Sequence, residues 1–100
     1  MTFGLAELQV WYLAQCDGDW EHTCGIKIET IDNPGWRLSV DLNGTELHGR
    51  SFERVEIARS QRDWVQAWVE DDRFDSACGP ENLAEVIEVF GRFAHSAAER

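Results

Sequence analysis

Apolar and polar residues alternate through the middle of the chain with the period of two that is typical of half-buried β-strands. Clusters of Asp, Asn, Gly, Pro and Ser interrupt this alternation, and these residue types favour turns. The pattern predicts four strands, at residues 24–31, 36–42, 52–59 and 63–70, and a short fifth strand around Phe74. Because strands linked by short turns usually pair with each other, we expect an antiparallel meander.

The strongest turn signal is Asp-Asn-Pro-Gly at residues 32–35, followed by Trp36. Pro34 presets the backbone of the first central turn position, and Gly35 is expected to supply a positive φ at the second. The strands on either side of this turn should therefore form a hairpin.

A helix is expected at each end of the chain. Within residues 5–16, apolar side chains recur every three or four positions at Leu5, Leu8 and Tyr12, which is the spacing of an amphipathic helix. Pro80 marks the start of a second helix, whose apolar stripe begins at Leu83. The sequence thus predicts an α+β fold in a single domain of residues 1–100, with an antiparallel sheet of four to five strands flanked by an N-terminal and a C-terminal helix.

Charge narrows the range of partners. The 100 residues include 19 Asp and Glu against 9 Lys and Arg, which gives a net charge of -10. Such a field repels nucleic acids and anionic membranes and attracts basic protein surfaces. No export signal or transmembrane segment is visible, so we expect a cytoplasmic protein with reduced cysteines.

The sequence contains residues that could bind a metal ion and residues that could act in acid–base catalysis. Cys16, His22, Cys24 and Cys78 are residue types that bind zinc, but they contain no Cys-x-x-Cys pair, and ordinary buried cysteines explain them better. Glu21 beside His22 is a possible acid–base pair, although a solvated acidic loop is the more common arrangement. We therefore expect no catalytic residues, no metal and no cofactor.

The fourth predicted strand carries the better functional signal. Trp64 and Trp68 lie on the face opposite its aliphatic side chains, and an acidic run follows them. Exposed aromatic residues among charges are typical of protein-binding surfaces. Coverage of the two tryptophans by the first helix, or by a second copy of the chain, is the open alternative. The candidate partner-binding residues are Trp20, Glu21, Trp64, Trp68, Glu70, Asp71 and Asp72.

Several short motifs resemble the immunity protein 53 family, which comprises predicted immunity proteins of bacterial polymorphic toxin systems. The motifs are Trp-Glu-His at residues 20–22, Gly-Ile-Lys-Ile-Glu-Thr at 25–30, Pro-Gly-Trp at 34–36 and Gly-Pro-Glu-Asn-Leu at 79–83. This resemblance implies a cytoplasmic protein that binds one cognate toxin and blocks it, and it implies no catalytic residues. Many toxins of such systems attack nucleic acids and carry basic clefts, which an acidic inhibitor would complement.

Two other hypotheses remain from different classes. A small metal-binding protein or enzyme would use the region of Glu21, His22 and the cysteines. A homo-oligomeric interaction module would use Trp64 and Trp68 at its subunit contact, and this possibility of a homodimer is compatible with an immunity role.

Overall fold

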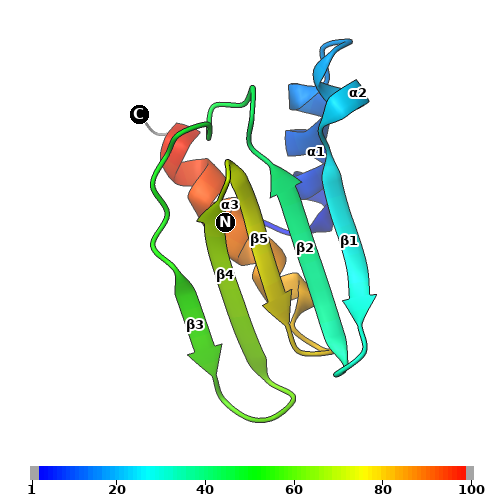
Figure 1. Ribbon diagram of the computed structural model, residues 1–100, viewed down its shortest axis with the longest axis vertical. Helices are drawn as coiled ribbons and strands as arrows, with labels where there is room; N and C mark the ends of the chain where they lie inside the picture. Colours follow the sequence, from blue (N-terminus) through cyan, green and yellow to red (C-terminus); the bar gives the residue numbers. More distant parts are fainter. Residues whose placement is uncertain (1–2, 99–100) are drawn as a thin grey trace.

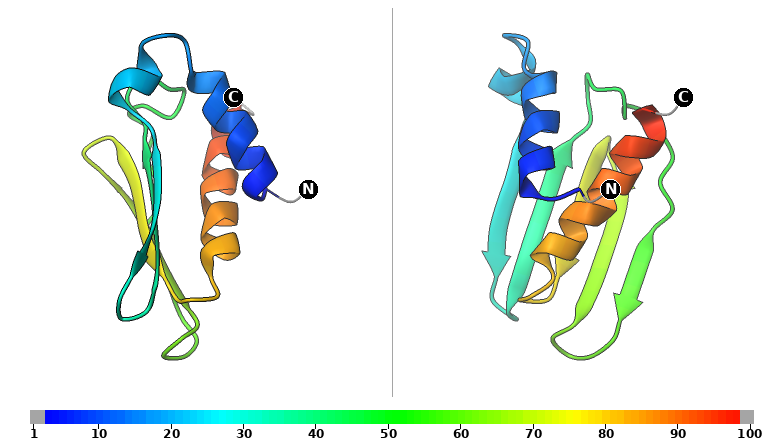
Figure 2. Two further views of the ribbon diagram at one scale, coloured as in Figure 1. Left: turned by 90° about the vertical axis from the view of Figure 1, so that its right-hand side faces the viewer. Right: turned by 180° about the vertical axis from the view of Figure 1, so that it is seen from behind.

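Five strands form one antiparallel sheet, and the two long helices pack on the same face of it (Figure 1). The computed structural model describes residues 3–98 of the chain. Seen edge-on, the sheet is one layer and the helices are a second layer on one side only (Figure 2). The elements are α1 (Leu5–Gln15), α2 (Trp20–Thr23), β1 (Ile26–Ile31), β2 (Gly35–Asp41), β3 (Val55–Ala58), β4 (Trp64–Glu70), β5 (Arg73–Cys78) and α3 (Leu83–Ala98). The α+β class and the flanking helices are therefore confirmed.

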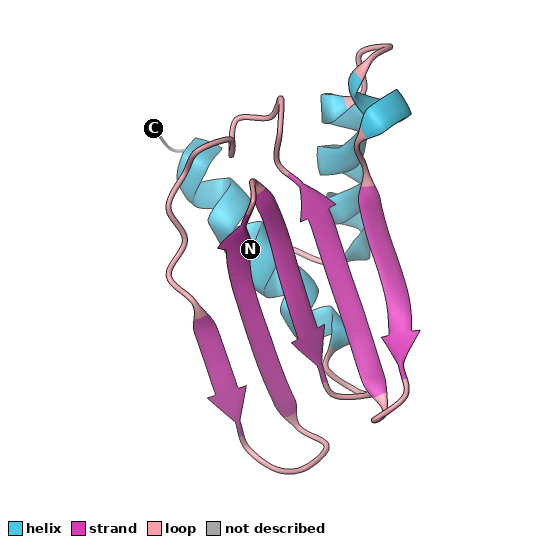
Figure 3. Cartoon of the chain, in the orientation of Figure 1, coloured by secondary structure: helices cyan, strands magenta, loops and turns pink. Residues whose placement is uncertain are grey.

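The order of the strands across the sheet departs from the expected meander. The order is β1-β2-β5-β4-β3, so the last strand lies in the centre. A two-residue turn at Asp71 and Asp72 links β4 to β5, and both residues have the positive φ, 54° and 58°, that a type I′ hairpin turn requires. From there β5 runs between β4 and β2 and pairs with both. The long segment between β2 and β3 contains no helix or strand (Figure 3).

The hydrophobic core lies between the sheet and α3. Phe90 of α3 packs against Phe74 of β5 with ring centroids 5.1 Å apart, and both side chains are fully buried. Trp11 of α1 packs edge-on against the same Phe90 at 5.0 Å. Alternation groups Leu38 with Val40 and Val65 with Ala67, but it does not indicate which face of the sheet the helices cover. The structure places these four residues on the helix side, where they have no exposed surface. The inner face of the sheet is therefore the aliphatic face.

Helix α3 begins at Leu83, three residues after the expected start at Pro80. The backbone N–H of Val86 donates to the carbonyl of Asn82, so Asn82 occupies the position that caps the helix. The Asn82 side chain also accepts from the Trp64 N–H at 3.3 Å and donates to Asp63 at 3.0 Å. Pro80 precedes the helix, and its carbonyl accepts a hydrogen bond from the indole of Trp36. The side chain of Asn82, which the sequence analysis did not use, therefore ties the start of α3 to Asp63 and Trp64.

Gly35 has a different role from the expected one. It is the first residue of β2, and its φ is not positive. A Cβ at this position would lie 2.1 Å from the carbonyl oxygen of Cys78 on β5. Glycine is needed here because two backbones approach closely, and the prediction of a left-handed turn residue was wrong.

Candidate functional site

The face of the sheet opposite the helices carries polar and aromatic side chains. We call it the open face, since none of the described helices lies on it (Figure 2). Strand alternation and the pairing register place one set of residues there. These are Lys27, Glu29, Arg37, Ser39, Asp41, Glu56, Trp64, Gln66, Trp68, Glu70, Arg73 and Asp75. This set contains five acidic and three basic residues, so most of the excess negative charge of the protein lies elsewhere.

A buried carboxylate stands at the centre of the open face. Asp75 is 8% exposed and accepts two hydrogen bonds from the guanidinium of Arg37, at 3.0 and 2.8 Å. The hydroxyl of Ser39 donates a third at 2.9 Å. Burial raises the pKa of the Asp75 carboxyl, but the bonds from Arg37 and Ser39 outweigh this effect, and the pKa lies below its usual value. Asp75 is therefore a fixed anion around which cationic and hydroxyl groups are held in place.

The next residue, Ser76, replaces part of the hydrogen-bond ladder between β2 and β5. Its hydroxyl donates to the carbonyl of Leu38 at 2.8 Å and accepts from the Leu38 N–H at 3.2 Å. Its own N–H donates to the Asp75 carboxylate at 3.0 Å. Both Ser76 and Leu38 are fully buried, so this exchange satisfies backbone groups that would otherwise be costly. The centre of the open face thus rests on a rigid, fully paired base.

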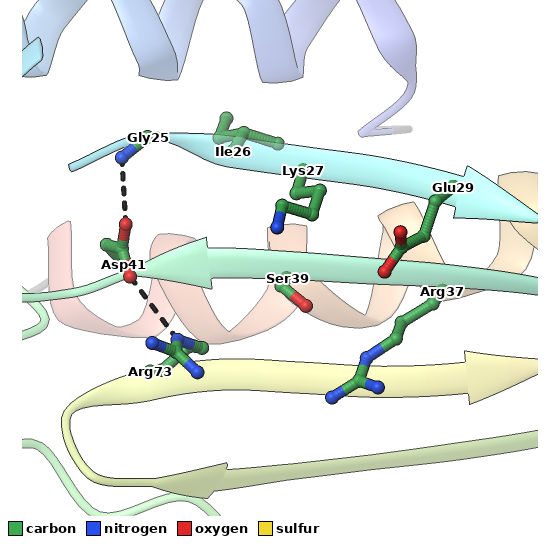
Figure 4. A pocket seen from close by; sticks show the side chains of 8 residues that line it. All are labelled: Gly25, Ile26, Lys27, Glu29, Arg37, Ser39, Asp41 and Arg73. Atoms are coloured by element: carbon green, nitrogen blue, oxygen red, sulfur yellow. Dashed lines mark hydrogen bonds and ion pairs between the residues drawn. The ribbon is translucent and has the colours of Figure 1, made fainter.

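A groove of about 420 Å³ lies beside this centre, over β1 and β2 (Figure 4). Arg73 and Asp41 form an ion pair at 3.3 Å along its wall, and the Asp41 carboxylate also accepts from the N–H of Gly25 at 2.9 Å. The groove is lined by Gly25, Ile26, Lys27, Glu29, Arg37, Ser39, Asp41 and Arg73. Its lining offers charged hydrogen-bonding groups of both signs and no cysteine or histidine nucleophile, which suits the binding of polar side chains.

Trp64 and Trp68 lie on the open face, as the alternation predicted. Both are half-buried, while Val65 and Ala67 between them are fully buried on the inner face. The guanidinium carbon of Arg54 lies 4.9 Å from the centre of the Trp68 ring, within cation–π distance. Helix α1 packs on the other side of the sheet, so the alternative that the first helix covers these tryptophans is wrong.

The acidic run has two different parts. Glu70 and Asp71 are exposed at the β4–β5 turn. The Asp72 carboxylate instead accepts from the Gly49 N–H at 3.3 Å and lies within hydrogen-bond distance of His48 Nδ1. Asp72 therefore anchors the loop after β2, whereas Glu70 and Asp71 remain available at the rim of the open face.

Trp20 and Glu21 lie away from the open face and have structural contacts. Trp20 is 6% exposed, packs edge-on against Trp11 at 6.3 Å, and donates its indole N–H to the carbonyl of Asn43 at 2.8 Å. The Glu21 carboxylate accepts from the backbone of residues 17 and 18 at 3.0 and 2.9 Å. These contacts within the chain explain the positions of Trp20 and Glu21. Their proposed contact with a partner protein stays a prediction.

The cysteines are not gathered at one place. Cys78 is buried in β5, whereas Cys16 and Cys24 are half-buried near α2. Burial raises the pKa of the Cys78 thiol to about 11. In the described residues, no three His, Cys, Asp or Glu side chains are placed to hold one metal ion. None of the helices in this part of the chain has the length and hydrophobicity to cross a membrane.

Comparison with protein families matches residues 5–95 to the model of immunity protein 53. The chain belongs to the immunity protein 53 family. The resemblance of its short motifs is therefore confirmed over nearly the whole length, and the family indicates an immunity function. No curated protein and no solved structure matches the chain.

The sequence analysis of this immunity protein missed the centre of its open face. The sequence analysis expected a short fifth strand around Phe74 but did not assign Asp75 and Ser76 to its interior. The sequence offered one signal for this strand. Residues 74, 76 and 78 occupy alternate positions, as the residues on one face of a strand do. Two polar residues at adjacent positions concealed it, because they are buried only through partners on β2.

Proposed function

We propose that this immunity protein neutralises a toxin by binding it through the open face of the sheet. The observation that carries the proposal is the partial exposure of Trp64 and Trp68 on a sheet face that the helices leave uncovered. Half-buried tryptophans are rigid, and a partner that completes their burial gains a large apolar contact area. In this proposal Trp68 and Trp64 are the anchors of the complex.

Charge supports a toxin with basic groups around its contact surface. The net charge of -10 attracts such a partner from a distance and increases the association rate. Glu70 and Asp71 lie exposed beside β4 and are the proposed partners for basic side chains. The acidic and basic residues elsewhere on the open face then select a toxin whose own charges match in position, which favours one cognate toxin over others.

Rigidity supports inhibition by binding alone. Arg37, Ser39 and Asp75 already hold one another before any partner arrives, so little side-chain freedom remains to be lost on binding. We propose that the complex is stoichiometric, forms in the cytoplasm, and occludes the toxin surface that acts on its target.

The test is co-expression with the toxin encoded in the same locus, followed by toxicity rescue and affinity measurement on the purified pair. Trp68→Ala should weaken binding by about 30-fold or more, because truncation of an aromatic anchor costs about 2 kcal/mol. Leu13→Ala is the matched control, since Leu13 is 71% exposed on α1, on the other side of the sheet. That variant should bind as the natural protein does.

Removal of charge at the rim provides a second test of the same surface. Asp71→Asn, which keeps a residue type that tolerates the positive φ of this turn, should slow association and reduce rescue, whereas Glu81→Gln, an equal charge change at an exposed residue after β5, should have little effect. Toxicity rescue without any complex would contradict the proposal and favour an enzyme that acts on the toxin's target. Full binding by folded Trp64→Ala and Trp68→Ala variants would also contradict it.

A further inference from the structure

Strand β1 forms an uncovered edge of the sheet. It contains six residues, pairs with β2 without interruption, and includes no proline (Figure 1). Four of the six, residues 27–30, are exposed. The opposite edge, β3, is only four residues long. Proteins usually shorten, bend or cover their edge strands, because free N–H and C=O groups recruit other strands. A long, straight edge such as β1 is therefore suited to pairing with another strand.

The pairing of β1 with β2 determines which of its backbone groups are free. The N–H of Asp41 donates to the carbonyl of Gly25 at 3.0 Å, so these two residues form a hydrogen-bonded pair. Such pairs alternate along an antiparallel ladder. The backbone groups of residues 27, 29 and 31 therefore point toward β2, whereas those of Ile26, Ile28 and Thr30 point outward from the sheet.

We propose that β1 pairs with β1 of a second copy of this chain, antiparallel, about a two-fold axis through Ile28. In this register Ile28 lies opposite Ile28 of the partner copy, and Ile26 lies opposite Thr30. All the outward backbone groups of these three residues then face one another and form hydrogen bonds. The product is a continuous ten-stranded sheet, twice the five strands of one copy.

The side chains of β1 select this register. Lys27, the only lysine in the sequence, lies opposite Glu29 of the partner copy, and Glu29 lies opposite its Lys27. These are the pairs without backbone hydrogen bonds, in which side chains approach most closely. The neighbouring registers that keep the outward backbone groups paired place Lys27 against Lys27 or Glu29 against Glu29. Opposite charges therefore meet only in the register centred on Ile28.

Burial supports the same pairing. Ile28 is 39% exposed although it faces the helix side of the sheet, because no helix covers the outer part of β1 (Figure 2). A second β1 would place another Ile28 against this side chain and cover both. The two-fold axis is perpendicular to the sheet, so both copies keep their helices on one side. The tryptophans of the open face remain free, and the pairing does not depend on the proposed toxin contact.

The size of the contact sets the expected affinity. A strand-to-strand edge buries less surface than a standard interface, and each copy carries a charge of -10 that opposes association. We therefore expect a reversible dimer with a dissociation constant in the micromolar range at moderate ionic strength. Added salt should strengthen the dimer at first, because it screens the long-range repulsion between the copies.

The test is sedimentation equilibrium over a range of concentrations with a set of charge variants. Lys27→Glu alone and Glu29→Lys alone place like charges opposite each other twice per dimer, and each should weaken dimerisation by about tenfold. The two changes combined in one chain restore opposite charges and should restore the dimer. A mixture of the two single variants should form a heterodimer in preference to either homodimer.

Controls separate this pairing from general charge effects. Arg62→Glu and Glu53→Lys make the same charge changes at exposed residues outside β1 and should dimerise as the natural chain does. Ile28→Pro removes one outward N–H and leaves the hydrogen bonds to β2 intact. Circular dichroism should show that this variant is folded, and sedimentation equilibrium should show that it is a monomer. A natural chain that stays monomeric at all concentrations would overturn the proposal, as would a double variant that does not recover. If the natural chain is monomeric and the Ile28→Pro variant no longer binds the toxin, then β1 pairs with a strand of the toxin instead of with a second copy.

Discussion

The ion pair of Arg37 and Asp75 gives the sharpest prediction about stability. Arg37→Met keeps most of the aliphatic length but removes both donors to the Asp75 carboxylate, at 3.0 and 2.8 Å. Loss of one partner from a buried pair costs about 3–5 kcal/mol. The Arg37 side chain is 43% exposed and the Asp75 side chain 11%, so water partly replaces the lost donors. We expect a loss of about 2 kcal/mol, or about 10 °C in Tm for a domain of this size.

The pH dependence identifies the cause of this loss. Because the pKa of Asp75 is lowered in the folded protein, its ionic contribution is present above the unfolded pKa of about 3.9 and disappears as pH falls through the folded pKa. In Arg37→Met, burial prevails and should raise the pKa of Asp75, so that protonation relieves the unpaired charge. The difference in unfolding free energy between the natural protein and Arg37→Met should therefore become smaller as the pH falls from about 6 to about 3.

Urea unfolding followed by tryptophan fluorescence measures this difference at each pH. Asp75→Asn is the matched control, since it leaves Arg37 free to be hydrated and should cost only about 1 kcal/mol. In the double variant, the losses should be far less than additive, because both changes remove one interaction. A difference that does not change with pH, or losses that simply add, would refute the assignment of the effect to charge.

Three further predictions concern positions at which β5 meets its neighbours. Ser76→Ala should cost about 2 kcal/mol in urea unfolding, because it leaves the buried N–H and carbonyl of Leu38 without their hydroxyl partner. Gly35→Ala should cost more than about 2 kcal/mol, because its Cβ meets a carbonyl on β5 at 2.1 Å, whereas Gly25→Ala, with nothing within 4 Å, should change stability by less than about 0.5 kcal/mol. The Cys78 thiol, with its pKa raised to about 11, should react with a maleimide probe only after unfolding, while mass spectrometry should show modification of the other two cysteines in the folded protein.

The sequence predicted the features of this fold that depend on local periodicity. Alternation separated the two faces of β4, so Trp64 and Trp68 were placed correctly opposite Val65 and Ala67, but it did not indicate which of these faces the helices cover. The position of β5 depends instead on its pairing with β2, at residues such as Trp36 with Cys78, and no local pattern records that contact. Hairpin turns indicate which strands are joined, but they do not indicate where a strand is inserted.

The centre of the open face was hidden from sequence for a related reason. Buried polar residues such as Asp75 are acceptable only when their partners are present, and here the partner Arg37 is 38 positions away along the chain. Read alone, Asp-Ser in the middle of a short segment resembles a turn. The distinguishing information is the hydrogen-bond network, which exists only in the folded sheet.

The central place of β5 has a consequence for how the protein is made. The β1–β2 and β3–β4 hairpins close locally, but they form no strand pairs with each other, and β5 alone joins them. While the chain is being synthesised, β2 and β4 each keep an unpaired edge until residues 73–78 have left the ribosome. A nascent or truncated chain therefore holds two separate hairpins rather than a smaller sheet. For an immunity protein, this means that protection begins only after β5 has been synthesised, and that stops before β5 leave aggregation-prone edges rather than partly functional proteins.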